Sequence, residues 1–374
     1  METEMTPAYR ISNVEHLPSP SLVVFPELVK NNIQQLISMV ESVNKLRPHI
    51  KTCKSADAIK LLQSAGINKF KCATIAEAEL LGTCEAKDVL LAYQPVGPNI
   101  DRFITLIKRF PNTSFACLID HRDIAEQLHQ AALNEDCQVG IFIDINVGMN
   151  RTGVQLAQIL PLVDHSLSLA NLKIRGLHCY DGHIHDASLE TRKIQCERYF
   201  TEIEQLVSQL NDRYQSSFTI VAGGTPTFPI HAASPRKDIE CSPGTFIFWD
   251  KGYQHLFSEQ PFQVAAFVIS RVISIVDDTK LCLDLGHKAI ASENELSKRV
   301  FFVNAPDART VSHSEEHLVI EVPNTRDYTV GDVFYGVPHH ICPTVALYDT
   351  AFTITDNRWN GEWPITARRR KITI

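Results

Sequence analysis

The most constraining feature of this sequence is a repeated alternation of short apolar runs with helical segments between residues 47 and 249. Short, continuously apolar strands that alternate with helices are typical of a parallel sheet covered on both faces, so the pattern predicts an α/β fold. Eight such units favour a closed (β/α)₈ barrel of the TIM type, with a doubly wound open sheet as the alternative. The candidate strands lie at residues 47–51, 71–74, 89–93, 115–119, 139–145, 174–180, 218–222 and 243–249.

After about residue 260 the alternation stops. A long β-branched run over 262–276 is followed by short strands at 281–284, 318–322 and 333–335, with no helical segments between them. Strands that follow one another in this way predict an antiparallel β domain. We therefore expect a barrel over residues 26–255 and a β domain over 256–374.

Composition excludes several classes of protein. The chain has 374 residues and a formal net charge of −7, with no basic tail, which argues against a nucleic-acid partner. No run of about 18 apolar residues exists, so we expect no membrane span. The N-terminus, with Glu2, Glu4 and Pro7, has no apolar core and predicts no signal peptide. Ten cysteines without CxxC pairs indicate reduced thiols and a cytoplasmic location.

Lys51 is the first candidate catalytic residue. Pro48 biases Arg47 toward extended geometry, and the β-branched Ile50 and Thr52 favour a strand that ends near Lys51. In α/β barrels the catalytic side chains gather at the carboxyl ends of strands. A lysine there can have its pKa lowered by burial and form a Schiff base with an aldehyde, although most lysines after a strand are solvated loop residues.

Further candidates follow later strands at the same predicted end of the barrel. Arg151 lies on a loop after the strand over 139–145, where its guanidinium could hold an anionic oxygen or form a surface ion pair. Tyr180 ends the sixth strand and His183 follows it, where the histidine could act as an acid or base, or merely belong to a loop.

The run Gly223-Gly224-Thr225 follows the seventh strand. Its backbone N–H groups and hydroxyl could converge on an anion, and barrels often bind a phosphate after their late strands. A tight turn with no ligand is the alternative.

His340 and Cys342 form a candidate metal pair. In an extended segment they would point to the same face, and an imidazole with a thiolate suits Zn²⁺. Two protein ligands leave positions open for a substrate, as a catalytic metal requires. His339 is an alternative ligand that the spacing leaves open, and His287, Glu316 and His317 receive no role.

The run Arg47-Pro48-His49-Ile50-Lys51-Thr52 resembles the lysine motif of the D-threonine aldolase and D-serine dehydratase family, which are pyridoxal-phosphate enzymes with an alanine-racemase-like fold of type III. The Asn-Arg-Thr-Gly loop at 150–153 and His-x-Cys-Pro-Thr at 340–344 resemble the same family. That family usually has a histidine two residues after the lysine, where this sequence has Cys53.

The resemblance implies a role for each candidate. Lys51 would carry pyridoxal phosphate, Arg151 would approach its phenolate oxygen, and Tyr180 would pack on or hydrogen-bond the cofactor. The run from Gly223 to Thr225 would hold its phosphate. The metal at His340 and Cys342 would be Zn²⁺, with Mn²⁺ or Mg²⁺ as alternatives. The resemblance also implies that residues 1–25 join the β domain and that the protein is a homodimer.

The implied function is a pyridoxal-phosphate- and metal-dependent lyase that acts on small D-3-hydroxy amino acids. We favour the D-threonine aldolase type, in which retro-aldol cleavage gives glycine and an aldehyde, because residues 179–184 look closer to aldolase-like members. A D-serine or 3-hydroxyaspartate dehydratase, which gives a 2-oxo acid and ammonia, is the alternative, and the His-x-Cys form points somewhat toward it. An amino-acid racemase, which needs no metal, and a non-catalytic single-barrel cofactor carrier are further alternatives.

Overall fold

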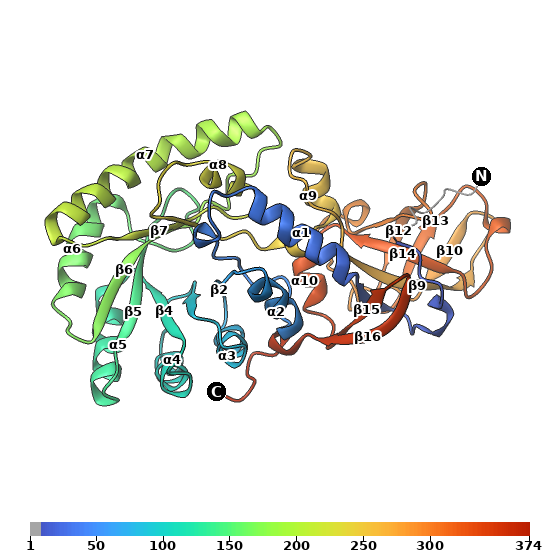
Figure 1. The fold of residues 1–374 in the computed structure, drawn as a ribbon. Helices are drawn as coiled ribbons and strands as arrows, with labels where there is room; N and C mark the ends of the chain where they lie inside the picture. Colours follow the sequence, from blue (N-terminus) through green and yellow to red (C-terminus); the bar gives the residue numbers. More distant parts are fainter. Residues whose placement is uncertain (1–8) are drawn as a thin grey trace. The chain divides into compact units, whose positions relative to one another are not determined.

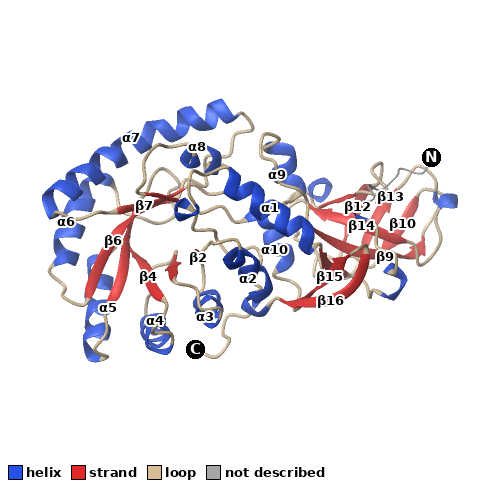
Figure 2. Cartoon of the chain, viewed as in Figure 1, coloured by secondary structure: helices blue, strands red, loops and turns tan. Residues whose placement is uncertain are grey.

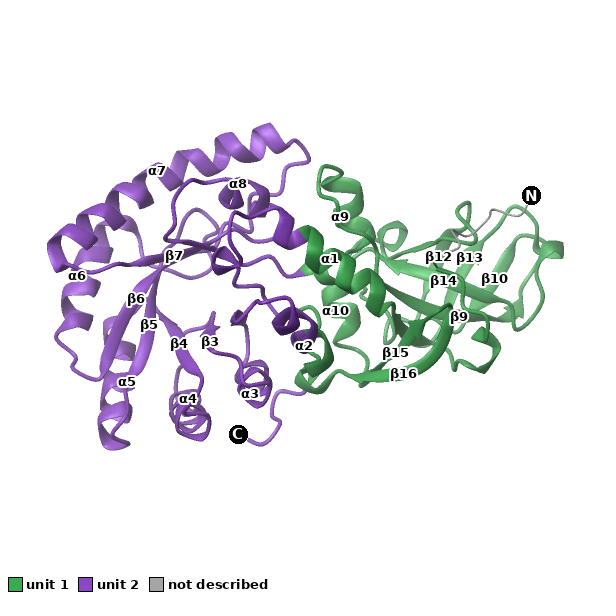
Figure 3. Ribbon diagram, in the orientation of Figure 1, with its two compact units in different colours: residues 1–35, 52–58, 245–368 green, residues 36–51, 59–244, 369–374 purple. Residues whose placement is uncertain are grey.

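The structure is a computed structural model that describes residues 9–374. Glu2, Glu4 and Pro7, on which the signal-peptide prediction rests, lie outside the described residues, as do the first eight residues of the predicted segment 1–25. The chain forms two compact units, coloured separately in Figure 3. We call residues 36–51, 59–244 and 369–374 the barrel unit. Residues up to 35, 52–58 and 245–368 are the β unit.

Seven parallel strands form the sheet of the barrel unit, each paired with the next in chain order. Helices follow the strands in sequence and cover the outer side of the sheet (Figures 1 and 2). The strands are β2 (Lys69–Cys72), β3 (Asp88–Leu91), β4 (Ser114–Ile119), β5 (Val139–Asp144), β6 (Leu172–Cys179), β7 (Thr219–Ala222) and β8 (Ile239–Cys241). The helices are α3 (Ile75–Thr83), α4 (Pro98–Arg109), α5 (Arg122–Asn134), α6 (Leu156–Leu167), α7 (Leu189–Tyr214) and α8 (Phe228–Ala232). Helix α2 (Ala56–Ser64) precedes them and spans the boundary between the units.

The segment around Arg47 closes the barrel without forming the regular strand that the sequence predicted. Leu46 bridges Cys241 of β8, and His49 bridges Lys71 of β2, so this segment lies between the two edge strands. Arg47 N–H donates to the Cys241 carbonyl at 2.8 Å, and Ile50 N–H donates to the Lys71 carbonyl at 3.0 Å. Pro48 has no N–H to donate, which limits the segment to isolated bridges.

The last predicted strand, at 243–249, is also corrected. The eighth strand position is β8, which ends at Cys241, and Thr245–Ile247 forms a 3₁₀ turn instead. The predicted (β/α)₈ architecture with an antiparallel β domain is nonetheless confirmed, with seven regular strands and one closing segment.

The β unit contains a nine-stranded sheet in which most strand pairs are antiparallel. Strand β1 (Ser21–Val24) pairs with β9 (Ala266–Ile275) in antiparallel orientation and with β15 (Thr350–Thr355) in parallel. The others are β10 (Lys280–Leu283), β11 (Val300–Phe302), β12 (Arg309–His313), β13 (Leu318–Glu321), β14 (Val333–Pro338) and β16 (Arg358–Pro364). Helices α9 (Lys251–Leu256) and α10 (Ile341–Val345) also belong to the β unit, and most of α1 (Pro26–Ser38) does so.

The two units differ from the domain bounds predicted from the sequence. The β unit includes residues 52–58, which directly follow Lys51, and its last segment begins at residue 245. No helix among the described residues combines the length and the apolar composition needed to cross a bilayer.

Candidate active site

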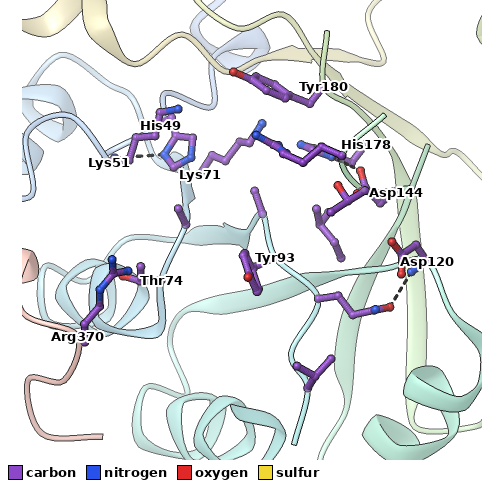
Figure 4. Close-up of a pocket in the computed structure, with 17 residues that line it drawn as sticks. His49, Lys51, Lys71, Thr74, Tyr93, Asp120, Asp144, His178, Tyr180 and Arg370 are labelled. Atoms are coloured by element: carbon purple, nitrogen blue, oxygen red, sulfur yellow. Dashed lines mark hydrogen bonds and ion pairs between the residues drawn. The ribbon is translucent and has the colours of Figure 1, made fainter. Parts of the chain in front are cut away.

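A cavity of about 570 Å³ lies in the barrel unit, and residues at or just beyond the carboxyl ends of its strands line much of it (Figure 4). It brings together three residues singled out from the sequence, namely Lys51, Arg151 and Tyr180. Residues that the sequence analysis did not select also line it, among them Lys71, Asp144 and His178. The carboxyl end of a barrel is where catalytic side chains are expected, so this cavity is the candidate active site.

Lys51 directly follows the closing segment of the barrel. Its backbone N–H donates to Nδ1 of His49 at 3.2 Å, and both side chains line the cavity. The bridges of the closing segment to β2 and β8 therefore fix the point from which the Lys51 side chain leaves the backbone.

Two positively charged side chains lie close to the ring of Tyr180. The guanidinium carbon of Arg151 is 4.9 Å from the centroid of the Tyr180 ring, and Nζ of Lys71 is 5.2 Å from it. Both distances fall within the range of cation–π attraction. The Tyr180 ring thus lies within cation–π distance of two cations of the cavity.

A buried imidazole–carboxylate pair ends the two neighbouring strands β5 and β6. Nδ1 of His178 lies 2.6 Å from Oδ1 of Asp144, and the two residues face each other in the strand register. Burial lowers the pKa of His178, and the positive charge of Lys71 lowers it further. Burial raises the pKa of Asp144, but its pairing with His178, a hydrogen bond from Thr152 and the charge of Lys71 outweigh this and lower it. His178 is thus held neutral, and its buried Nε2 has no hydrogen-bond partner among the described residues.

The glycine run after β7 also lies close to Tyr180. Gly223 has a φ of +74°, which L side chains rarely adopt, and a Cβ on Gly224 would lie 3.2 Å from Cε2 of Tyr180. Thr225 Oγ1 accepts a hydrogen bond from Gly244 N–H at 3.2 Å. A side chain at either glycine would press on its surroundings, because a Cβ on Gly223 would lie 3.1 Å from Cδ2 of His231. The Gly224 N–H donates to Oδ1 of Asp181 at 3.4 Å.

The buried carboxylate of Asp181 anchors the turn that follows β7. Asp181 accepts hydrogen bonds from Thr227 Oγ1 at 2.8 Å and from Tyr199 Oη at 2.7 Å, and contacts Nε2 of His231 at 2.8 Å. Burial raises the pKa of Asp181, but these hydrogen bonds and the charge of His231 lower it to about 2. Among residues 9–374, Asp181, His231 and Cys196 have ligand atoms within 4.8 Å of one another, although the carboxylate and imidazole are already engaged with each other.

His183 does not line the cavity that contains Lys51. It is exposed and lines a separate pocket of about 390 Å³, together with Tyr199. A Cβ on Gly148 would lie 2.9 Å from Nε2 of His183. The acid–base role predicted for His183 stays a prediction.

His340 and Cys342 lie in the β unit, and the extended segment assumed for them is wrong. His340 caps the N-terminus of α10 and Cys342 belongs to its first turn, yet the two side chains hydrogen-bond each other. Burial lowers the pKa of His340, but the hydrogen bond and charge of Cys342, together with Glu293 at 2.6 Å, raise it to about 9. Cys342 Sγ also lies 3.0 Å from Oγ1 of Thr52, the residue that follows Lys51 in the chain.

Two family models match most of the chain. Residues 26–250 match the model described as alanine racemase, N-terminal domain. Residues 265–354 match the model described as putative serine dehydratase domain. The helix α9 lies between the two matches, in residues 251–264.

Curated relatives match almost the full length. The chain is 25% identical to the 3-hydroxy-D-aspartate aldolase of Paracoccus denitrificans (strain Pd 1222), over 97% of this chain and 95% of that protein. It is also 25% identical to the D-threonine aldolase of an Arthrobacter species, over 97% and 96%. Its fold is that of the D-threonine aldolase from Filomicrobium marinum, with a TM-score of 0.87, 24% identity and coverage of 95% and 96%.

Proposed function

Because this chain belongs to the family described as alanine racemase, N-terminal domain, we propose that it is a pyridoxal-phosphate- and divalent-metal-dependent lyase. Its substrates would be small D-3-hydroxy amino acids, and its reaction would be of the D-threonine aldolase type. The observation that carries this proposal is the cavity that brings the Lys51 amine, the Arg151 guanidinium and the Tyr180 ring together. The names of the two aldolase relatives support the choice of substrate and reaction.

The residues of the cavity fit pyridoxal phosphate. An amine at Lys51 suits its aldehyde, and a guanidinium at Arg151 suits its anionic ring oxygen. The turn over Gly223, Gly224 and Thr225 combines two glycines with the hydroxyl of Thr225, and this composition suits a phosphate. The buried Nε2 of His178 has no hydrogen-bond partner among residues 9–374, so it would be available to hydrogen-bond a polar group of a ligand.

Each of these residues would have a distinct task. The bound cofactor supplies an electron sink for negative charge that develops at the substrate Cα. Lys51 would hold the cofactor through Nζ, and Arg151 would fix its orientation. Asp144 would accept a hydrogen bond from Nδ1–H of His178, so that Nε2 of the neutral imidazole is a hydrogen-bond acceptor.

A divalent metal would be held by His340 and Cys342. Their side chains contact each other, and an imidazole with a thiolate suits Zn²⁺, with Mn²⁺ or Mg²⁺ as alternatives. A bound metal supplies Lewis acidity toward a substrate oxygen. Both ligands must lose a proton first, and the raised pKa of His340 makes this binding depend on pH.

A dehydratase is the second candidate function. The family model that matches residues 265–354 is described as a putative serine dehydratase domain, and that range contains both proposed metal ligands. A D-serine or 3-hydroxyaspartate dehydratase would use the same cavity and release a 2-oxo acid and ammonia. An amino-acid racemase would need no metal. A homodimer and a cytoplasmic location belong to the same proposal.

Product analysis separates these functions. Purified protein is incubated with D-threonine, D-3-hydroxyaspartate and D-serine, before and after chelation and with Zn²⁺ or Mn²⁺ added back. Glycine with an aldehyde supports the aldolase, whereas a 2-oxo acid with ammonia supports the dehydratase. Full activity after chelation would contradict the metal pair at His340 and Cys342.

Borohydride reduction tests the lysine assignment directly, because two lysines line the cavity. Protein loaded with pyridoxal phosphate is reduced, digested and mapped by mass spectrometry. We expect the pyridoxyl group on Lys51. A label on Lys71 in place of Lys51 would refute the assignment.

A further inference from the structure

Lys71 is a second lysine inside the cavity of Lys51. It lies on β2, its side chain is only 4% exposed, and it points into the cavity toward His178 (Figure 4). Its Nζ lies 5.2 Å from the Tyr180 ring centroid, and Arg151 lies 4.9 Å from the same centroid. The helix α3 begins with Thr74 as its N-cap, directly after β2, which anchors the strand end that carries Lys71.

The ammonium of Lys71 forms no hydrogen bond or ion pair with any described residue. Another well-buried lysine of the barrel unit does have such a partner. Nζ of Lys45, which is also 4% exposed, donates to the Ser234 carbonyl at 2.6 Å. Lys71 therefore differs from Lys45, whose buried ammonium is hydrogen-bonded.

The carboxylates near Lys71 are already engaged. Asp144 is bound to His178 and to the Thr152 side chain, and Asp120 accepts the Gly153 N–H at 3.0 Å. Four cations line the cavity, namely Lys51, Lys71, Arg151 and Arg370, against the two carboxylates of Asp120 and Asp144. A buried ammonium without a partner is unfavourable, so such a cavity favours an anionic ligand.

We propose that Lys71 is the second anion-binding residue of this cavity and receives an oxyanion of the bound reactants. This inference rests on the proposed function, because it takes pyridoxal phosphate and an amino acid as those reactants. The oxyanion belongs either to the ring oxygen of the cofactor or to the carboxylate of the substrate. Each presents an anionic oxygen that a compact ammonium can bind.

The titration of Lys71 agrees with this role. Burial, together with the positive charges of Lys51 and Arg151, lowers its pKa to about 7. The negative charges of Asp144 and Asp181 act in the opposite direction, and His178 also faces it. An anion that binds beside Lys71 would favour its charged form, so ligand binding and protonation would be coupled.

The test compares Lys71→Met, which keeps the volume and removes the charge, with wild type. Lys69→Met is the matched control, on the same strand but outside the cavity. Three quantities are measured for each protein. They are the Kd of pyridoxal phosphate from its visible absorption, the KM and kcat for D-threonine at saturating cofactor, and the melting temperature of the cofactor-free protein.

We expect Lys71→Met to raise either the cofactor Kd or the KM by about 10- to 100-fold, the loss expected for one charged hydrogen bond. A change confined to the cofactor Kd assigns the ring oxygen, and a change confined to KM assigns the carboxylate. Lys71→Arg, which keeps the charge, should recover most of the loss. If both quantities stay within twofold of wild type, Lys71 binds no anion and the inference is overturned.

A second measurement covers the case in which Lys71→Met does not fold. Wild-type protein is acetylated with and without pyridoxal phosphate, and then with D-alanine added to the loaded protein. Mass spectrometry should find Lys71 protected by one of these ligands, and equal modification in all three samples overturns the inference. Wild-type protein that binds no pyridoxal phosphate refutes the proposed function itself, whereas unchanged constants in Lys71→Met refute only the role of Lys71.

Discussion

Replacing Arg47 with methionine tests how the closing segment holds the barrel unit together. The Arg47 side chain is fully buried, and its Nε donates to Oε2 of Glu240 at 2.6 Å. One terminal nitrogen donates to Oδ1 of Asp88 at 2.7 Å. Without Arg47, Glu240 keeps only Lys69, and Asp88 keeps only Arg175, as ion-pair partners among the described residues.

The expected loss of stability follows from this arrangement. Removing one partner of a buried ion pair costs about 3–5 kcal/mol, because the other charge is left uncompensated. Since each carboxylate retains one cation, we expect the lower end, about 3 kcal/mol, which raises the opening equilibrium by about 150-fold. Lys69→Met is the control, and because Lys69 is 31% exposed it should cost about 1 kcal/mol or less.

Amide hydrogen exchange with mass spectrometry is the suitable assay. All three tryptophans, at positions 249, 359 and 363, belong to the β unit, so their fluorescence does not report on the barrel unit. Peptides that cover β2 and β8 should exchange faster in Arg47→Met. An increase no larger than that of Lys69→Met would refute the reasoning.

The loss of stability in Arg47→Met should depend on pH, because Arg47 lowers the pKa of Asp88. Burial raises the pKa of Asp88, but the charges and hydrogen bonds of Arg47 and Arg175 outweigh it and hold it at about 2, below its ordinary 3.8. The ionised carboxylate therefore contributes about 2 kcal/mol above pH 3.8, and this is lost as pH falls from 3.8 toward 2. The deficit of Arg47→Met should shrink over the same interval, and a deficit that stays constant would contradict the ion-pair account.

Three further predictions concern the candidate site. Cys342→Ser should weaken Zn²⁺ binding, measured by equilibrium dialysis, by at least about 100-fold, whereas Cys282→Ser on β10 should leave it unchanged; equal affinities would argue against the pair. Gly223→Ala, at a φ of +74°, should cost about 1 kcal/mol and raise the Kd of pyridoxal phosphate about tenfold, and unchanged affinity would remove the turn from the site. Asp144→Asn replaces the charged hydrogen bond to His178, and such a bond contributes about 1.5–3 kcal/mol. It should lower the melting temperature and raise the Kd of pyridoxal phosphate about tenfold. A normal melting temperature and a normal Kd would contradict the role of Asp144.

The local pattern of the sequence was sufficient for the architecture. Apolar runs that alternate with helical segments predicted a parallel barrel followed by an antiparallel β domain, because burial on both faces of a strand leaves a continuous apolar run. The same pattern placed Lys51, Arg151 and Tyr180 at the carboxyl ends of strands, and these three line one cavity. The position along a strand thus predicts which end of the barrel a side chain occupies.

Tertiary structure decided which of these side chains meet. The pair of His178 with Asp144 depends on the register between β5 and β6. The burial of Lys71 depends on the residues from other strands that pack around it. A histidine and an aspartate at the ends of neighbouring parallel strands are a signal that could have indicated the pair. The sequence of β2 gives no comparable sign for Lys71.

The sequence by itself determined the order and type of the elements, because periodicity records how each residue is buried by its neighbours along the chain. It did not determine that His183 lies outside the cavity or that the segment at Arg47 closes the barrel through isolated bridges. Those features depend on contacts between residues that are far apart in the chain, such as Arg47 with Glu240. Only the folded structure brings such residues to hydrogen-bonding distance.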